Sequence, residues 1–209
     1  MIFLRFSQDE FEKLKNHLVL YRCVMKDMQT RVDVLQEDFN NLKQYNPIEH
    51  VKTRLKTPES IARKLNSRGI ALTADDARQH LTDIAGIRCI CSYAKDISDL
   101  AEIFKRQPDI KLLAEKDYVT NPKPSGYRSH HLILNVPVHL TDRTEHLAVE
   151  LQIRTQAMDF WATLEHKARY KYNDAMPLHI SQALEKCAQE IADLDERMYE
   201  IQRSVSLEI

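Results

Sequence analysis

The sequence predicts a mixed α/β fold with a long helix at each end. Two segments carry apolar residues at alternating steps of three and four, the heptad spacing of one helix face. Between them, short alternating stretches typical of strands interleave with helical periodicity. The 209 residues suffice for one sizeable core, so we expect a single domain. It would consist of an N-terminal helical region (1–46), an α/β core (47–172) and a C-terminal helix (177–209).

The two heptad segments have clear boundaries. The spacing of Ser7 and Glu10 predicts a capping box, and Pro47 ends the first segment because the residue before a proline disfavours helix. Its apolar seam is Phe11, Leu14, Leu18, Tyr21, Met25, Met28, Val32, Leu35, Phe39 and Leu42. After Pro177, the second seam is Ile180, Leu184, Cys187, Ile191, Leu194, Met198, Ile201 and Val205. Either seam could cover the core of its own chain or an interface between subunits.

The middle of the chain predicts alternating strands and helices. Apolar and polar residues alternate at 87–93, 109–117, 131–138 and 146–155, which predicts strands. Helical periodicity is found at 95–107 and 157–172.

Composition excludes several classes of protein. Three glycines (Gly69, Gly86 and Gly126) cannot form a G-x-G-x-x-G turn or a P-loop. The net charge of −1 gives no overall attraction to nucleic acid or a membrane, and no apolar run approaches the roughly 20 residues that span a bilayer. The four cysteines include no C-x-x-C pair, so we expect reduced, mostly buried thiols in a cytoplasmic protein.

Two carboxylates are candidates for a metal site. On the strand predicted at 146–155, Leu147 and the alternate apolar residues share one face, so Glu150 lies on the other. Asp83 directly precedes another predicted strand. Glu150 could belong to an ordinary solvated face and Asp83 could cap a turn. However, two acids from neighbouring strands supply the few hard oxygen ligands that Mg2+ needs beside water and phosphate.

A loop and a basic run add groups that bind nucleotides. The loop at 121–131 contains two prolines, a glycine, lysine, arginine, histidines and Tyr127. Tyrosine can stack on a purine and the cations can hold phosphates, although a surface hairpin loop is the ordinary alternative. Between His50 and Arg68 there are six basic residues and one acid, a pattern also typical of a solvated helix face. Their coincidence with the carboxylates favours a nucleotide enzyme.

Several ordered motifs resemble a known family. These are DIAGIR (83–88), KPSGYRSHH (123–131) and VELQIRT (149–155), followed by Phe160-Trp161-Ala162 and Glu165-His166. Over roughly 47–172 the chain resembles the RelA/SpoT-type (p)ppGpp synthetase domain, and its length and helical flanks resemble the single-domain small alarmone synthetases. The resemblance implies a nucleotidyltransferase-like mixed sheet surrounded by helices. It also implies transfer of the β,γ-pyrophosphate of ATP to the 3′-hydroxyl of GDP or GTP, releasing AMP, in the stringent response.

The resemblance also implies roles for individual residues. Asp83 and Glu150 would be catalytic and would hold Mg2+, with Glu150 close enough to help deprotonate the 3′-hydroxyl. The residues implied for ATP are Arg54, Lys56, Lys64, Arg88 and Lys116, of which the two arginines would sandwich the adenine. Those implied for GDP or GTP are Lys123, Tyr127, His131, Gln152, Arg154 and Glu165, with Tyr127 stacking on the guanine. A homotetramer is expected on the same grounds.

Other readings of the sequence stay open. The chain has no His-Asp dipeptide, so we expect no alarmone hydrolysis. The preferred acceptor (GDP, GTP or GMP) and the general base are not determined. One alternative is a degenerate guanine-nucleotide or RNA-binding module, although nothing in the sequence specifically supports RNA binding. Others are a toxin-like relative that pyrophosphorylates adenosine nucleotides or transfer RNA, and an interaction protein built on the heptad helices. No membrane partner is expected.

Overall fold

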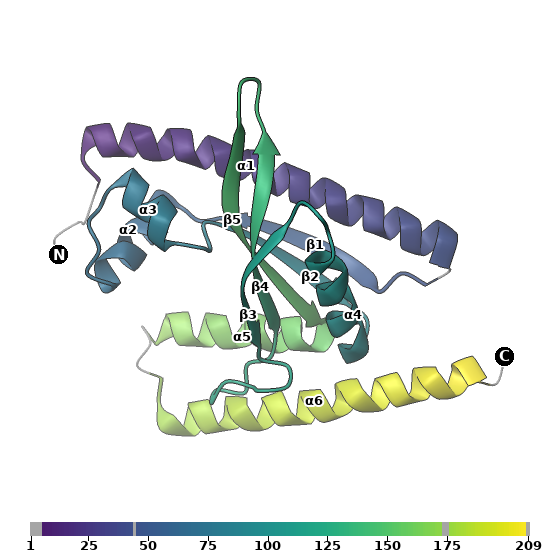
Figure 1. Cartoon of the computed structure of the whole chain (residues 1–209). Coiled ribbons are helices and arrows are strands. Elements are labelled where there is room, and N and C mark those ends of the chain that lie inside the picture. Colours follow the sequence, from purple (N-terminus) through teal and green to yellow (C-terminus); the bar gives the residue numbers. More distant parts are fainter. Residues whose placement is uncertain (1–5, 44, 173–175, 208–209) are drawn as a thin grey trace.

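The computed structural model of the chain describes residues 6–43, 45–172 and 176–207. Its helices are α1 (Gln8–Asp38), α2 (Pro58–Ser67), α3 (Ala74–His80), α4 (Ala94–Lys105), α5 (Gln156–Lys171) and α6 (Leu178–Leu207), and a π-helical turn, Phe39–Lys43, follows α1. The strands are β1 (Ile48–Leu55), β2 (Ala85–Cys91), β3 (Lys111–Asp117), β4 (His130–His139) and β5 (Thr144–Thr155). The predicted fold class, a mixed sheet surrounded by helices, is confirmed (Figure 1).

One five-stranded sheet organises the molecule, with the strand order β1-β2-β5-β4-β3. The two central neighbours β2 and β5 are parallel, whereas β1–β2, β4–β5 and β3–β4 are antiparallel. The hairpin between β4 and β5 extends past α1 (Figure 1). A parallel pair needs a long crossover between its strands, and here α4, β3 and β4 lie in the chain between β2 and β5.

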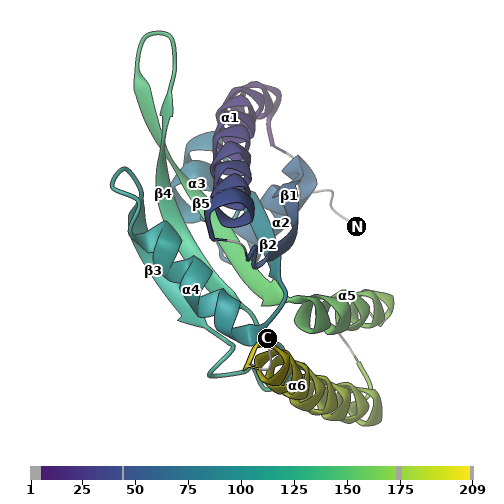
Figure 2. The same ribbon diagram turned by 90° about the vertical axis from the view of Figure 1, so that its right-hand side faces the viewer.

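One face of the sheet forms the core. Leu147, Val149, Leu151 and Ile153 of β5 are at most 1% exposed and belong to the same buried cluster as α1 and α4. Figure 2 shows α1 and α4 alongside the strands, and both helices contact β2, β4 and β5. Because side chains alternate along a strand, Glu150, Gln152 and Arg154 are left for the opposite face.

The seam of α1 is intramolecular. Leu14, Leu18, Tyr21, Met28 and Val32 are all buried in the core. The helix ends at Asp38, earlier than Pro47 requires, and Leu42 beyond it is 74% exposed.

Half of the expected capping box is present at the start of α1. The Ser7 hydroxyl accepts a hydrogen bond from the amide of Glu10 at 3.3 Å. The Glu10 carboxylate instead accepts from the amide of Ala74 at 2.7 Å, so it caps α3 and ties the two helices together.

The seam of α6 is only partly covered. Its first half lies beside α5, where the Trp161 indole donates to the Leu184 carbonyl at 2.9 Å (Figure 1). Its second half is exposed by 51–57% at Leu194, Met198, Ile201 and Val205. The core of this chain therefore buries the α1 seam, whereas it leaves the C-terminal half of the α6 seam exposed.

Three elements were not predicted from the sequence. The basic run at 50–68 is divided between β1 and α2 rather than lying on one helix face. β1 is an edge strand with mostly exposed side chains, so its apolar alternation is weak. The third element, α3, has only seven residues, too few for a clear helical period.

The expectation of mostly buried thiols holds for two of the four cysteines. Cys89 and Cys91 are buried, and burial raises the pKa of Cys89 to about 12, which keeps that thiol protonated and unreactive. Cys23 is half-buried and Cys187 is exposed, and all four cysteines are free. Within the described ranges, no helix is long and apolar enough to cross a membrane.

A matched pair of valines on α1 tests the assignment of its buried face. Val24 is 0% exposed and Val34 is 62% exposed. We expect Val24→Ala to lower the free energy of unfolding by about 2 kcal/mol, because it removes two buried methyl groups and leaves a cavity. Val34→Ala should change it by less than about 0.5 kcal/mol. Urea unfolding monitored by circular dichroism measures both, and equal effects would contradict the assignment.

Candidate functional site

A polar row crosses the face of the sheet opposite the core. Lys52 pairs with Arg88, Arg88 with Gln152, Gln152 with His131 and His131 with Lys116, so one register position supplies a polar residue from every strand. Residues in register on neighbouring strands point to the same face. The row therefore joins the basic run of β1 to the polar side of β5 and to the end of the 121–131 loop.

Both candidate carboxylates line one cavity of about 270 Å3 on this face. Gly86 of β2 pairs with Glu150 of β5, and Asp83 lies just before β2. The parallel pairing therefore brings together two acids that are far apart in the chain. The remaining lining residues are Lys52, Thr53, Arg54, Lys56, Gly86, Ile87, Arg88 and Gln152. Of the residues implied for ATP, Arg54, Lys56 and Arg88 are among them.

Two lysines hold Asp83 in its charged form. Lys56 and Lys64 both donate to Oδ2 of Asp83 at 2.5 Å. Burial would raise the pKa of this carboxyl, but the hydrogen bonds and charges of the lysines outweigh burial and lower the pKa below its usual value. Burial also lowers the pKa of Lys56, against the opposing effect of Asp83.

The other oxygen of Asp83 fits a metal ligand. Oδ1 is buried and has no hydrogen-bond partner, which is costly for a carboxylate unless another group binds it. It belongs to an ionised carboxylate in a cavity that also contains Glu150. Mg2+ is bound in proteins through one or two carboxylates together with water and substrate phosphates, so this donor set fits the ion.

Glu150 contacts His131 and Gln152, two of the residues that the resemblance implies for GDP or GTP. Its Oε1 lies 3.4 Å from Nδ1 of His131, and its Oε2 accepts from the amide of Gln152 at 2.9 Å. Burial would raise the pKa of Glu150, but the hydrogen bonds from His131 and Gln152 lower it overall. Glu150 is therefore ionised at neutral pH, so it can bind a cation or accept a proton, although a lowered pKa makes it a weak base.

The loop between β3 and β4 brings Tyr127 to the same network. Its hydroxyl lies 2.9 Å from Nε2 of His131 and accepts from Arg154 at 2.5 Å. Lys123 and Arg154 lie over the ring, 4.7 and 4.9 Å from its centroid. The contacts of the His131 ring with Tyr127 on one side and Glu150 on the other link the loop to the carboxylates.

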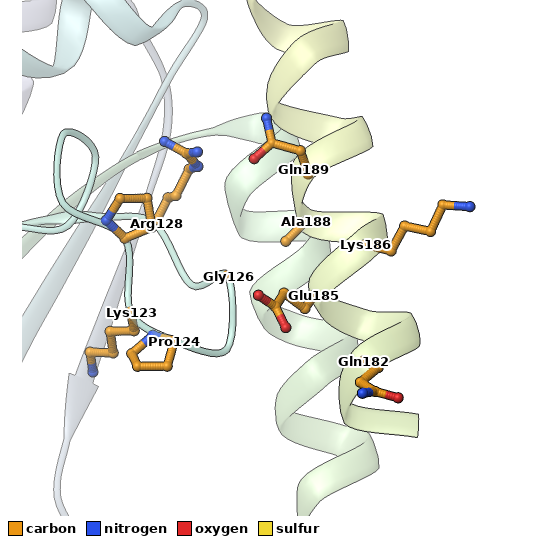
Figure 3. A pocket seen from close by; sticks show the side chains of 10 residues that line it. Lys123, Pro124, Gly126, Arg128, Gln182, Glu185, Lys186, Ala188 and Gln189 are labelled. Atoms are coloured by element: carbon orange, nitrogen blue, oxygen red, sulfur yellow. The ribbon is translucent and has the colours of Figure 1, made fainter. Parts of the chain in front are cut away.

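The loop packs against α6 through Gly126. Gly126 has φ +87°, and a Cβ built on it would lie 2.5 Å from the Cβ of Ala188, so only glycine fits this approach. Tyr127 packs against the small cluster of Trp161, Ala188 and neighbouring apolar residues. Figure 3 shows Glu185 and Ala188 of α6 facing this loop across a cavity of about 430 Å3. Neither Asp83 nor Glu150 lines this second cavity.

Two residues implied by the resemblance, Lys116 and Glu165, do not line the cavity that contains the carboxylates. Lys116 is exposed on the edge strand β3, three strands from β2 and roughly 14 Å across the sheet, so it does not line the cavity with Arg54. Glu165 forms an ion pair with Arg169 one turn along α5. The roles expected for both residues stay predictions.

The structure adds Asp159 and Lys52 to the site. Asp159, in the first turn of α5, accepts hydrogen bonds from Lys52, Arg88 and Arg154 at 3.1, 3.0 and 3.4 Å. Asp159 could not be singled out from the sequence, because acids are common in the first turn of any helix. Lys52 was visible only as one cation of the basic run.

The site combines two carboxylates with surrounding cations in one cavity on the sheet, an arrangement typical of enzymes that transfer phosphoryl groups. The family described as "Region found in RelA / SpoT proteins" matches residues 53–175. GTP pyrophosphokinase YwaC of Bacillus subtilis is 42% identical over 194 residues, which are 93% of this chain and 92% of that protein. The chain belongs to the RelA/SpoT family.

Solved structures agree with this assignment. Small alarmone synthetase 2 from Bacillus subtilis superposes with a TM-score of 0.83 at 41% identity, covering 91% of this chain and 98% of that one. Small alarmone synthetase 1 from the same organism, bound to its product pppGpp, gives a TM-score of 0.85 at 33% identity, covering 91% and 97%.

The lysine pair on Asp83 predicts a measurable change in titration. We expect Lys64→Gln to raise the pKa of Asp83, because one of the two hydrogen bonds that oppose burial is lost. Carbon-13 NMR of the Asp83 carboxyl measures this directly. Lys13→Gln, which removes an exposed lysine paired with Glu10, is the matched control and should leave the Asp83 titration unchanged.

The same substitution changes the pH dependence of stability. A lowered pKa stabilises the fold above the unfolded value of about 3.9, and this contribution disappears as the pH falls through the folded value. In Lys64→Gln this contribution should be smaller and should be completely lost at a higher pH, because the folded pKa moves toward the unfolded value. An unchanged Asp83 titration in this variant would contradict the proposed electrostatics.

Proposed function

We propose that this protein is a (p)ppGpp synthetase that transfers the β,γ-pyrophosphate of ATP to the 3′-hydroxyl of GDP or GTP and releases AMP. The observation that carries the proposal is the joining of Asp83 and Glu150 in one cavity with Arg54 and Arg88. Membership of the RelA/SpoT family and the similarity to proteins named GTP pyrophosphokinase and small alarmone synthetase support it.

The donor side suits ATP. Guanidinium planes stack on aromatic bases, so Arg54 and Arg88, both lining the cavity, would hold the adenine between them without a glycine-rich loop. Lys56 and Lys64 would neutralise the phosphates. Asp83 and Glu150 would hold Mg2+, which when bound supplies charge neutralisation at the phosphate oxygens.

The acceptor side suits a guanine nucleotide. Tyr127 would stack on the base, and Lys123 and His131 would contact the acceptor phosphates or the transferred group. Gln152 and Arg154 hold Glu150 and Tyr127 in place through the hydrogen bonds described above. Tyr127 and Glu150 are joined through His131, so the acceptor would lie beside the donor cavity.

The reaction needs positioning and charge neutralisation more than covalent chemistry. The acceptor 3′-oxygen forms a bond to the β-phosphorus of ATP, and the bond from that phosphorus to the α,β-bridging oxygen breaks. AMP leaves with the bridging oxygen, and the hydroxyl proton passes to Glu150. The cations around the cavity stabilise the charge that develops on the phosphate oxygens.

A second part of the proposal concerns assembly. We propose that the protein is a cytoplasmic homotetramer formed by a single synthetase domain, with the exposed half of the α6 seam in a subunit interface. The supporting observation is the row of apolar side chains at Leu194, Met198, Ile201 and Val205, each more than half exposed in the isolated chain.

Carboxylate substitutions test the catalytic assignment. We expect Asp83→Asn and Glu150→Gln to lower synthesis by roughly 100-fold or more, because each removes a charge needed by the metal and phosphates, while circular dichroism remains unchanged. Glu145→Gln is the matched control, since Glu145 lies on the same strand and pairs with Arg78 and Arg143 outside the cavity.

The assay uses Mg2+ and ATP labelled on the γ-phosphate, with GDP, GTP, GMP, ADP and uncharged transfer RNA offered separately. Label in a guanosine tetra- or pentaphosphate with equal AMP is the expected result. Label in an adenosine product or in RNA would identify the toxin-like alternative. Absence of transfer with retained nucleotide binding would favour the degenerate binding module. Turnover like that of the wild type in either carboxylate variant would remove the metal assignment.

The interface is tested by adding charge to the α6 seam. We expect Ile201→Glu to convert the tetramer to smaller species at micromolar concentration, because a buried unpaired carboxylate is costly. Leu113→Glu changes an apolar residue of similar exposure on the edge strand β3 and should leave the assembly intact. Light scattering coupled to size-exclusion chromatography gives the masses. If the wild-type protein is a monomer, the proposed interface is wrong and the exposed half of the α6 seam is an ordinary solvent-exposed helix face.

A further inference from the structure

Asp159 occupies the junction between the two halves of the site. It lies in the first turn of α5, which follows β5 directly, and only 7% of it is exposed. Its Oδ2 accepts from Lys52, and its Oδ1 accepts from both Arg88 and Arg154. One buried carboxylate therefore serves three cations that come from β1, β2 and β5.

On the donor side, Asp159 fixes the plane of Arg88. Nη1 of Arg88 donates to Asp159 at 3.0 Å and Nε donates to Gln152 at 3.4 Å, so both contacts are made by the edge of the guanidinium. The Arg88 side chain is still 30% exposed, while that of Asp159 is 9% exposed. A guanidinium can stack through its face while its edge donates hydrogen bonds, so these contacts leave the stacking surface available.

On the acceptor side, Asp159 neutralises a buried arginine. The Arg154 side chain is 5% exposed, and Asp159 is its ion-pair partner within the described ranges. Arg154 in turn donates to the Tyr127 hydroxyl and to Gln152, and its guanidinium lies over the Tyr127 ring. A buried cation that loses its counter-charge is strongly disfavoured, so the position of Arg154, and with it Tyr127, depends on Asp159.

We propose that Asp159 is a positioning residue shared by the two substrate sites, which orients Arg88 for ATP and, through Arg154, Tyr127 for the guanine nucleotide. The proposal rests on the function proposed above for Arg88 and Tyr127. Asp159 itself touches neither reacting group. Without its charge, Lys52, Arg88 and Arg154 would repel one another, and the two arginines would lose their common orientation.

The test is the steady-state kinetics of Asp159→Asn, which keeps the shape and removes the charge. We expect the KM for ATP and the KM for GDP each to rise roughly tenfold, with a smaller change in kcat, because charge-assisted hydrogen bonds that orient binding groups are lost. Asp96→Asn is the matched control. Asp96 is also 7% exposed, but it accepts from Tyr45 and from the Tyr93 amide at the start of α4. It should lower the melting temperature while leaving both KM values unchanged.

A double substitution separates positioning from general damage. If Asp159 acts on ATP through Arg88, Asp159→Asn should raise the KM for ATP much less in an Arg88→Met background than in the wild type, while its effect on GDP persists. Asp159→Glu keeps the charge that Arg154 needs but displaces the carboxylate. Asp159→Glu should fold and raise both KM values by a smaller factor. If Asp159→Asn does not fold, the KM values of Asp159→Glu test the proposal instead.

Unchanged KM values in Asp159→Asn, or in Asp159→Glu where Asp159→Asn does not fold, would overturn the proposal. A rise for one nucleotide only would overturn the shared role. Failure of the proposed function would look different, because the wild type itself would then transfer no label from ATP to GDP. Failure of the present proposal leaves an active wild type and only removes the effect of Asp159→Asn on the KM values.

Discussion

The parallel pairing of β2 with β5 is the constraint on which the rest of the site depends. It sets Gly86 beside Glu150 and Arg88 beside Gln152, and it brings Asp83 to the same cavity. The register is fixed by burial, because Val149, Leu151 and Ile153 fill the core from one face of β5. A slip of one residue would exchange these side chains with the polar ones of the other face. The stability of the core and the geometry of the site therefore have a common origin.

Electrostatics then divides the polar face into two connected halves. Asp83 and Glu150 are ionised although burial opposes it, the first because of Lys56 and Lys64 and the second because of His131 and Gln152. The lysines belong to the half proposed for ATP, and His131 contacts Tyr127 in the half proposed for the guanine nucleotide. The same groups that set the charge of the two acids are thus those expected to contact the substrates, so substrate binding and carboxylate ionisation are coupled.

The sequence predicted those parts of the site that reside in one element. Alternation along β5 separated Glu150, Gln152 and Arg154 from the core, and the prolines and glycine marked the loop of Tyr127. Strand order is not written in such patterns, so Lys116 could not be assigned to the far edge of the sheet. Asp159 was missed because its importance comes from cations of three different strands. The α6 seam looked like that of α1, but among the described residues only its first half packs into an apolar cluster, and Leu194, Met198, Ile201 and Val205 are more than half exposed.

The pairing of β2 with β5 is proposed to build one metal-binding centre from two distant acids. The affinity for Mn2+, measured by electron paramagnetic resonance with a non-hydrolysable ATP analogue present, tests this most directly. The set is the wild type, Asp83→Asn, Glu150→Gln and the double variant. If both carboxylates hold the same ion, each single substitution removes most of the affinity and the double variant loses little more. Losses that add in the double variant would mean independent sites and would contradict the account.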